Sequence, residues 1–214
     1  MSRLALLLVS IAALALDRGA MAASIEASVR DSAGKPVADT VVYAVSPASA
    51  PEARPGRVAT IEQVDREFVP YVSVVHAGTT VFFPNRDPIL HHVYSFSPAK
   101  PFEIKLYGSK SPVEVLFDKP GVVALGCNIH DWMIAYVLVV PTSHFAKTGA
   151  DGIARLRDLP AGTYEVRAWH PQQKAPVEPR SVALESAGNA SFAVVVDTVP
   201  RKPKYKPPLD RLKY

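Results

Sequence analysis

Gly126-Cys127-Asn128-Ile129-His130-Asp131-Trp132-Met133 is the most distinctive stretch of this 214-residue chain, and its spacing is Cys-x-x-His-x-x-Met. A thiolate, an imidazole and a thioether therefore fall within seven residues. Soft sulfur, a borderline nitrogen and a weak axial thioether form the ligand set that proteins use for copper. Such a site needs a second histidine from elsewhere in the chain, and His91 and His92 are the upstream candidates.

Cys127 is the only cysteine in the sequence, so it cannot form a disulfide within the chain. In an oxidising compartment outside the cytoplasm, a single thiol indicates either an intermolecular bridge or a special role such as metal ligation. A buried, inert cysteine is the ordinary alternative. The positions of His130 and Met133 favour ligation, and Met133 is the only methionine beyond the expected signal segment.

The N-terminus predicts export. Met1-Ser2-Arg3 is charged, residues 4–16 are apolar, and Ala20-Met21-Ala22 fits a small-x-small cleavage site. The apolar run is shorter than the ~20 residues that a transmembrane helix needs. We therefore expect residues 1–23 to be a cleaved helical signal peptide and the mature protein to be periplasmic. An uncleaved membrane anchor is the alternative.

The rest of the sequence predicts an all-β protein. Short runs rich in Val, Tyr and Phe are separated by Gly, Pro and Asn, as is typical of β-sandwiches and barrels. Residues 46–56 read as a loop, and residues 58–68 are compatible with either a strand or a short helix. The strands are expected over residues 25–30, 37–45, 71–75, 79–84, 93–96, 113–117, 121–125, 134–140, 152–156, 165–170 and 190–196.

The formal charge of +4 is unevenly distributed. Residues 200–214 carry six basic side chains and one acidic side chain, a net of +5, so the remainder is close to −1. Proline-rich, like-charged segments are usually extended and solvated. We expect residues 199–214 to form a basic tail that makes at most a weak contact with an anionic surface. With no basic stripe elsewhere, nucleic acid is not an expected partner.

Two separated segments resemble the transthyretin-like, carboxypeptidase regulatory-like β-sandwich. The first is Ser28-Val29-Arg30-Asp31-Ser32-Ala33-Gly34-Lys35-Pro36-Val37, and the second contains Leu159-Pro160-Ala161-Gly162-Thr163-Tyr164. Residues 24–48 are too short to build a core alone. The resemblance therefore implies a discontinuous sandwich made of residues 24–48 and 145–198, with residues 58–141 inserted as a second domain. Insertions at loop tips are well tolerated because domain termini often lie close together.

The inserted region resembles the cupredoxins, the plastocyanin, amicyanin and azurin group. The resemblance rests on the motif Phe82-Phe83-Pro84-Asn85, the pair His91-His92, and the strand Gly121–Gly126 that leads to Cys127. It implies a Greek-key sandwich with one Cu(I)/Cu(II) ion bound by His91, Cys127, His130 and Met133. The spacing of the last three ligands looks most like amicyanin, and proteins named for methylamine utilization are similar.

Three positions depart from the family pattern. Ile129 replaces a common proline, Leu125 replaces a common aromatic residue, and His92 replaces an asparagine. These departures leave the type of copper site open, and they leave His92 as the alternative to His91. Because adjacent residues on a strand point to opposite faces, only one of the two is expected to bind.

The resemblance implies an exported, mononuclear type 1 copper protein that transfers single electrons to or from an unidentified redox protein. Two alternatives stay open: a copper-binding or delivery protein without electron traffic, and a metal-free structural or ligand-binding sandwich. An enzyme is not expected. The sequence shows no paired carboxylates and no serine or cysteine triad, and four protein ligands leave no open metal position for a substrate.

Overall fold

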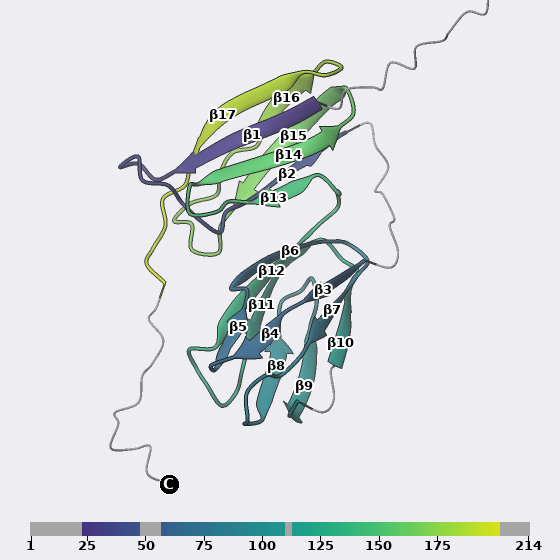
Figure 1. Ribbon diagram of the computed structural model, residues 1–214, viewed down its shortest axis with the longest axis vertical. Helices are drawn as coiled ribbons and strands as arrows, with labels where there is room; N and C mark the ends of the chain where they lie inside the picture. The colour runs from purple at the N-terminus through teal and green to yellow at the C-terminus, as the bar shows by residue number, and fades with distance from the viewer. Residues whose placement is uncertain (1–22, 48–56, 110–112, 202–214) are drawn as a thin grey trace, which may run out of the picture.

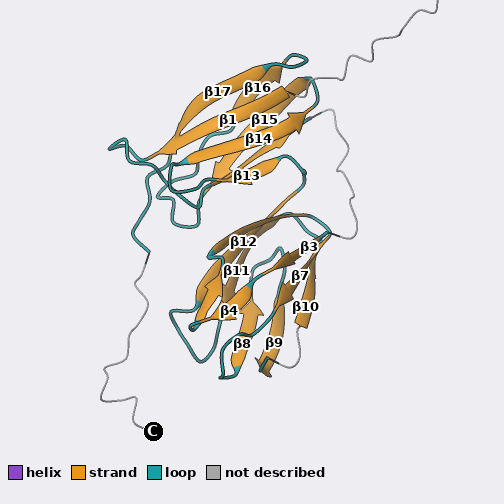
Figure 2. Ribbon diagram, viewed as in Figure 1, coloured by secondary structure: helices purple, strands orange, loops and turns teal. Residues whose placement is uncertain are grey.

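The computed structural model describes residues 23–47, 57–109 and 113–201. Over these ranges the chain consists of strands, turns and loops, which confirms the all-β prediction. Figure 2 shows two β-rich bodies, one above the other in the view. The predicted signal segment, except for Ala23, and the tail beyond Arg201 lie outside the described residues. No helix in the described ranges has the length and hydropathy that a membrane span requires.

The upper body, here called the terminal sandwich, is built from both ends of the described chain (Figure 1). One sheet has the strand order β14-β1-β17 and the other β13-β2-β15-β16. Strand β1 pairs antiparallel with β14 and parallel with β17, so segments more than 120 residues apart form one sheet. The strands are β1 (Ala23–Arg30), β2 (Val41–Val45), β13 (Phe145–Lys147), β14 (Ile153–Leu159), β15 (Gly162–Trp169), β16 (Arg180–Leu184) and β17 (Asn189–Val195).

The lower body, here called the central sandwich, contains the strands in between. A three-stranded sheet of order β10-β7-β3 faces a five-stranded sheet of order β6-β12-β11-β8-β9, and β4 and β5 form a separate hairpin. The strands are β3 (Val58–Thr60), β4 (Glu62–Val64), β5 (Glu67–Val69), β6 (Val72–His76), β7 (Thr79–Phe83), β8 (His91–Ser95), β9 (Phe102–Tyr107), β10 (Val113–Phe117), β11 (Gly121–Gly126) and β12 (Ile134–Val140).

Alternating side chains build the core of each sandwich. The burial pattern of β1 alternates strictly, and its inward residues Ile25, Ala27 and Val29 belong to one apolar cluster with β14, β15 and β17. The central sandwich has its own cluster, which includes Phe83, Phe117 and Cys127. Burial of apolar surface at about 25 cal/mol per Å² is the main stabilising contribution in such cores.

A third, smaller apolar cluster joins the two sandwiches. Val41 of β2 packs with Val72 of β6 and with Leu138 and Val140 of β12, and aromatic residues from both sandwiches surround them. The ammonium group of Lys147 adds polar contacts, a hydrogen bond of 2.9 Å to the carbonyl of Val72 and an ion pair with Asp39. The central sandwich therefore rests against the terminal one through the outer face of its five-stranded sheet.

Arg201 makes a further contact between the sandwiches. The chain leaves β17 and brings the Arg201 guanidinium to 3.9 Å from the centre of the Tyr71 ring, and to 3.5 Å from the carboxylate of Glu67. Tyr71 and Glu67 belong to the central sandwich. The start of the predicted tail is therefore held against the central sandwich by a cation–π contact and a long ion pair.

The structure also resolves a local ambiguity. Residues 58–68, compatible with a strand or a short helix, contain β3, β4 and the start of β5. Asp65 and Arg66 turn the chain between β4 and β5 with left-handed backbone angles, φ 53° and 59°. Three strands that the sequence did not predict, β9, β13 and β16, complete the sheets.

Candidate metal centre

The predicted ligand loop is a closed connection between two paired strands. Strands β11 and β12 pair antiparallel up to Gly126 opposite Ile134, so residues 127–133 form the connection. Within it the backbone N–H of Met133 donates to the carbonyl of His130 at 2.9 Å. The tight turn holds Cys127, His130 and Met133 at one end of the central sandwich.

The second histidine comes from β8, which lies beside β11 in the same sheet. Tyr94 of β8 pairs with Gly126, so the start of β8 lies next to the ligand loop. The side chain of His91 is fully buried there. One ligand atom from each of His91, Cys127 and His130 lies within 4.8 Å of the other two. The structure thus gathers three of the four predicted ligands into one cluster, here called the His–Cys–His cluster.

Distances within the cluster leave room for an ion between the groups. The Cys127 Sγ atom is 3.9 Å from His130 Nδ1, and the imidazole rings of His91 and His130 have centroids 5.1 Å apart. Met133, the fourth predicted ligand, is 1% exposed and belongs to the same apolar cluster as Cys127. A thiol and two imidazoles, with a thioether in the same apolar cluster as the thiol, make up a copper-type donor set.

His92 lies outside this cluster. Its Nε2 atom is 2.9 Å from a carboxylate oxygen of Glu103 on β9, and its ring packs at a tilt against that of Tyr94, with centroids 5.6 Å apart. Only the backbone N–H of His92 approaches the sulfur of Cys127. The sequence left His91 and His92 as alternatives, and the alternation of side chains along β8 places His91 in the cluster.

Charge interactions within the cluster favour a thiolate. Burial raises the pKa of the Cys127 thiol, but a hydrogen bond with His91, backbone N–H groups of His92 and Ile129 and the charge of His91 outweigh it, so the pKa is lowered. Conversely, burial lowers the pKa of His91, and its hydrogen bonds with Cys127 and Asp87 raise it above its usual value. A deprotonated thiol is the form that binds a metal ion.

His130 is tuned in the opposite direction. Burial is the largest cause that lowers its pKa. The charges of His91 and Arg66 lower it further, and the charge of Asp87 has a smaller, opposing effect. A neutral imidazole is the metal-binding form of histidine. The low pKa of His130 therefore keeps its ring nitrogens available as ligands.

The nitrogens of His91 have unequal partners. Its Nε2 atom contacts a carboxylate, whereas its buried Nδ1 atom has no hydrogen bond to a nitrogen or oxygen atom. Unpartnered ring nitrogens also occur at His76 and His92, so this feature alone is not specific. Of these three histidines, only His91 lies in a cluster with a thiol and a second imidazole. The residues therefore fit a soft metal ion held by Cys127, His91 and His130.

A buried polar network supports the loop that precedes His91. The amide of Asn85 donates to the carbonyls of Ile89 at 2.8 Å and Tyr107 at 3.0 Å. The hydroxyl of Tyr107 donates to the carbonyl of Phe83 at 2.6 Å and accepts from the amide of Gln63. Burial raises the pKa of Tyr107 to about 12, so it remains a neutral hydrogen-bonding group. The network fixes the path of residues 84–90.

Several supporting residues were not predicted from the sequence, above all Asp87, Gln63 and Tyr107. Asp87 lies four residues before His91 in a loop, and in a loop this spacing does not predict whether two side chains will be in contact. Gln63 and Tyr107 lie on β4 and β9, far away in sequence. An acidic residue close to a predicted ligand histidine is the one available signal, because ligating histidines usually donate their second N–H to an oxygen.

Gly126 has a packing role at the entrance of the ligand loop. A Cβ atom at this position would lie 2.6 Å from the Tyr94 ring, closer than atoms can approach. We expect Gly126→Ala to lower the free energy of unfolding by about 1 kcal/mol, the low end of the overpacking range, because the atoms in the way are the outer end of the partly exposed Tyr94 ring. Chemical denaturation of the metal-free protein measures this effect separately from any change in metal binding.

Gly149→Ala is the matched control, since a Cβ there would lie 3.4 Å from its nearest neighbour, an ordinary contact. Tyr94→Leu combined with Gly126→Ala should recover part of the lost stability because the clashing ring is gone. Equal stability of the Gly126→Ala and Gly149→Ala variants would contradict the packing role.

No protein-family model and no curated protein matches the sequence. Solved structures that resemble parts of the chain include a purple cupredoxin from Nitrosopumilus maritimus, at 23% identity and TM-score 0.35, covering 38% of this chain and 99% of that one. Amicyanin from Paracoccus versutus matches at 16% identity and TM-score 0.36, covering 48% of this chain and 99% of that one.

A copper-containing nitrite reductase from Thermus scotoductus SA-01 matches at 26% identity and TM-score 0.37, over 53% of this chain and 28% of its own length. Likeness at these TM-scores assigns no function. The methylamine-utilization resemblance has no support among these structures. The case for a metal centre therefore depends on the side chains themselves: a thiol and two imidazoles whose ligand atoms lie within 4.8 Å of one another.

Proposed function

We propose that the central sandwich is a cupredoxin-type domain that binds one copper ion and transfers single electrons. The observation that carries this proposal is the His–Cys–His cluster, with Met133 buried beside it at the end of the same loop. A bound copper ion would supply the one-electron couple Cu(II)/Cu(I). The chain supplies a trigonal set of two imidazoles and a thiolate, with a thioether as the axial candidate.

Rigid support of the ligands suits electron transfer. Cys127, His130 and Met133 share a short loop between paired strands, and His91 lies on the neighbouring strand. Backbone pairing on both sides limits movement of the ligands when the charge of the ion changes. Burial of His91 and Cys127 also excludes water from the site. Small rearrangement between oxidation states is what an electron carrier requires.

The proposal includes the setting of the site. We infer that residues 58–141 are inserted into a discontinuous domain of residues 24–48 and 145–198, because each set of strands has its own sheets and apolar cluster. We also infer export by a signal peptide, from the pattern of residues 1–23.

A redox protein is the proposed partner. Near the cluster, Leu90 and Ile129 are about half exposed, and apolar surface of this kind suits a transient contact.

We propose a carrier rather than an enzyme, because four protein ligands would leave no position for a substrate on the ion. A copper-delivery protein without electron traffic is the alternative function. It would use the same residues, and the two differ in the speed and reversibility of electron exchange.

The test is the spectrum and voltammetry of the protein after loading with Cu(II) and dialysis. We expect one copper per chain, an intense thiolate-to-copper absorption in the visible range, and fast, reversible one-electron voltammetry. Copper binding with the absorption but without reversible exchange would favour delivery. Failure to retain copper through dialysis would refute both functions and leave a metal-free sandwich.

A further inference from the structure

Asp87 forms a buried pair with the proposed ligand His91. The Oδ2 atom of Asp87 is 2.7 Å from His91 Nε2, and the side chains are 10% and 0% exposed. Histidine uses one ring nitrogen as donor and the other as acceptor when neutral. With a carboxylate at Nε2, the proton lies on Nε2, and the buried Nδ1 atom keeps its lone pair.

The carboxylate of Asp87 is itself held in place by the β4–β5 hairpin. The backbone N–H of Asp65 donates to Oδ1 at 2.7 Å, and the backbone N–H of Arg66 donates to Oδ2 at 2.9 Å. Both turn residues have positive φ angles, which non-glycine residues seldom adopt. This uncommon turn directs two consecutive N–H groups at one carboxylate, and unusual backbone of this kind concentrates at functional sites.

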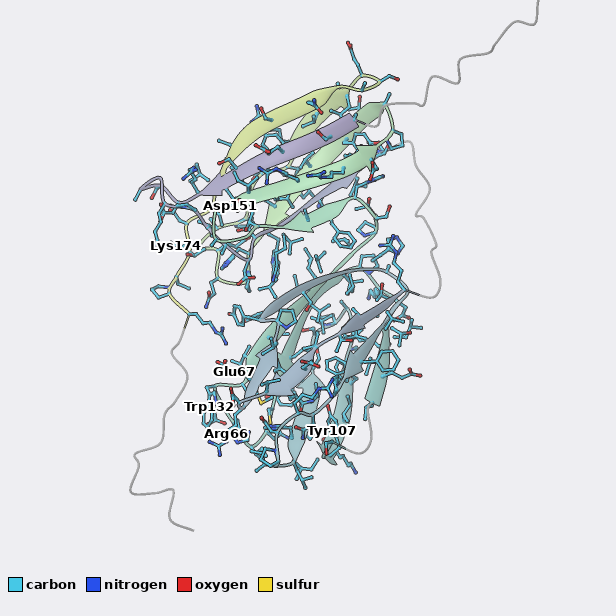
Figure 3. All side chains as sticks on the ribbon, viewed as in Figure 1. Arg66, Glu67, Tyr107, Trp132, Asp151 and Lys174 are labelled. Carbon is cyan, nitrogen blue, oxygen red and sulfur yellow. The ribbon has the colours of Figure 1, made fainter. Side chains whose placement is uncertain are left out.

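The same turn also holds the ligand loop. The indole N–H of Trp132 donates to the carbonyl of Arg66 at 3.2 Å, and the Trp132 ring lies 5.1 Å from the ring of His130. Figure 3 shows Arg66 and Trp132 together in the lower part of the central sandwich, away from the terminal sandwich. One hairpin turn therefore contacts both chain segments that supply the proposed ligands.

We propose that Asp87 is a positioning residue that fixes the ring of His91 with Nδ1 toward the copper site, and that its negative charge favours Cu(II) over Cu(I). This inference rests on the proposed function. A carboxylate behind a ligating imidazole fixes its tautomer and increases its basicity. The added negative charge stabilises the ion of higher charge more, so the reduction potential is lower than it would be with a neutral residue at position 87.

The test compares Asp87→Asn with wild type. The amide oxygen can take the place of Oδ2 and still accept from His91, whereas the charge is gone and the NH2 group would face the backbone N–H of Asp65. We expect the affinity for Cu(II), relative to that for Cu(I), to fall about 10–100-fold, the range typical of outer-shell changes. Each tenfold change corresponds to a rise of about 59 mV in reduction potential for a one-electron couple. Voltammetry and competition titrations with each copper ion measure both quantities.

Glu103→Gln is the matched control, because Glu103 makes the same kind of pair with His92, at 2.9 Å. Since His92 lies outside the cluster, Glu103→Gln should change the reduction potential by only a small fraction of the change caused by Asp87→Asn. A Glu103→Gln shift as large as that of Asp87→Asn would overturn the inference, and so would an Asp87→Asn potential equal to that of wild type.

A readout on metal-free protein separates this inference from the proposed function. At a pH above the raised pKa of His91, nitrogen-15 NMR spectra of the imidazoles should show His91 as a single tautomer protonated at Nε2 in wild type and as a mixture in Asp87→Ala. Far-UV circular dichroism checks that each variant is folded. If wild type fails to bind copper, the proposed function is refuted. The NMR result would still show whether Asp87 fixes the tautomer of His91. If wild type shows the copper absorption and Asp87→Ala keeps the single tautomer, the inference alone falls.

Discussion

Cys127→Ser should abolish the intense visible absorption of the copper-loaded protein. The absorption requires a thiolate bonded to copper, and a serine hydroxyl is neither deprotonated near neutral pH nor a soft ligand. Cys127 is 4% exposed, and serine is close to it in size, so the fold should survive. Visible spectra at matched copper loading measure the effect, and circular dichroism checks the fold.

Asn128→Ser is a suitable control, since Asn128 lies in the same loop with its side chain exposed. This variant should keep the absorption of wild type. An unchanged spectrum of Cys127→Ser would exclude the thiolate as a ligand and would remove the basis for a type 1 site.

The second large expected effect is a difference in copper affinity between the variants of the two adjacent histidines. His91→Ala should weaken binding of Cu(II) by about 100-fold or more, beyond the ~10–100-fold loss usual for outer-shell residues, because a proposed direct ligand is removed. His92→Ala should weaken binding by less than about tenfold, since only its backbone N–H approaches the sulfur of Cys127. Competition with a chromophoric copper chelator gives both affinities.

Each histidine serves as the control for the other, because both are buried and both pair with a carboxylate. Thermal unfolding of the metal-free variants tests for a general loss of stability. A larger loss of affinity in His92→Ala than in His91→Ala would mean that copper binding requires a different conformation of β8.

Local sequence predicted the part of the site that is local in space. Cys127, His130 and Met133 lie within seven residues, and the strand-forming residues on both sides close them into one connection between β11 and β12. The all-β class was also predictable, because period-two alternation and turn residues are local signals. Strand β9 was missed although Phe102, Ile104 and Leu106 alternate with two charged residues, a period-two pattern that does indicate a strand.

The residues that complete the site come from distant segments. Gln63 reaches Tyr107 only after β4 and β9 have been brought together, and Asp87 reaches His91 only through the path of the loop before β8. Their contacts depend on which strands are neighbours and on the path of a loop. Neither is encoded in the spacing of residues along the chain.

The sequence by itself predicted a copper-type ligand set, an all-β fold and two candidates for the remaining histidine. The tertiary structure brings only one of those candidates into the His–Cys–His cluster. Strand β8 pairs with β11 so that the side chain of His91, and not that of His92, reaches Cys127. A change of one residue in this pairing would exchange the two faces of β8, because side chains alternate along a strand. Asp87 was likewise found only through the fold, since a turn 21 residues earlier in the chain holds its carboxylate against His91.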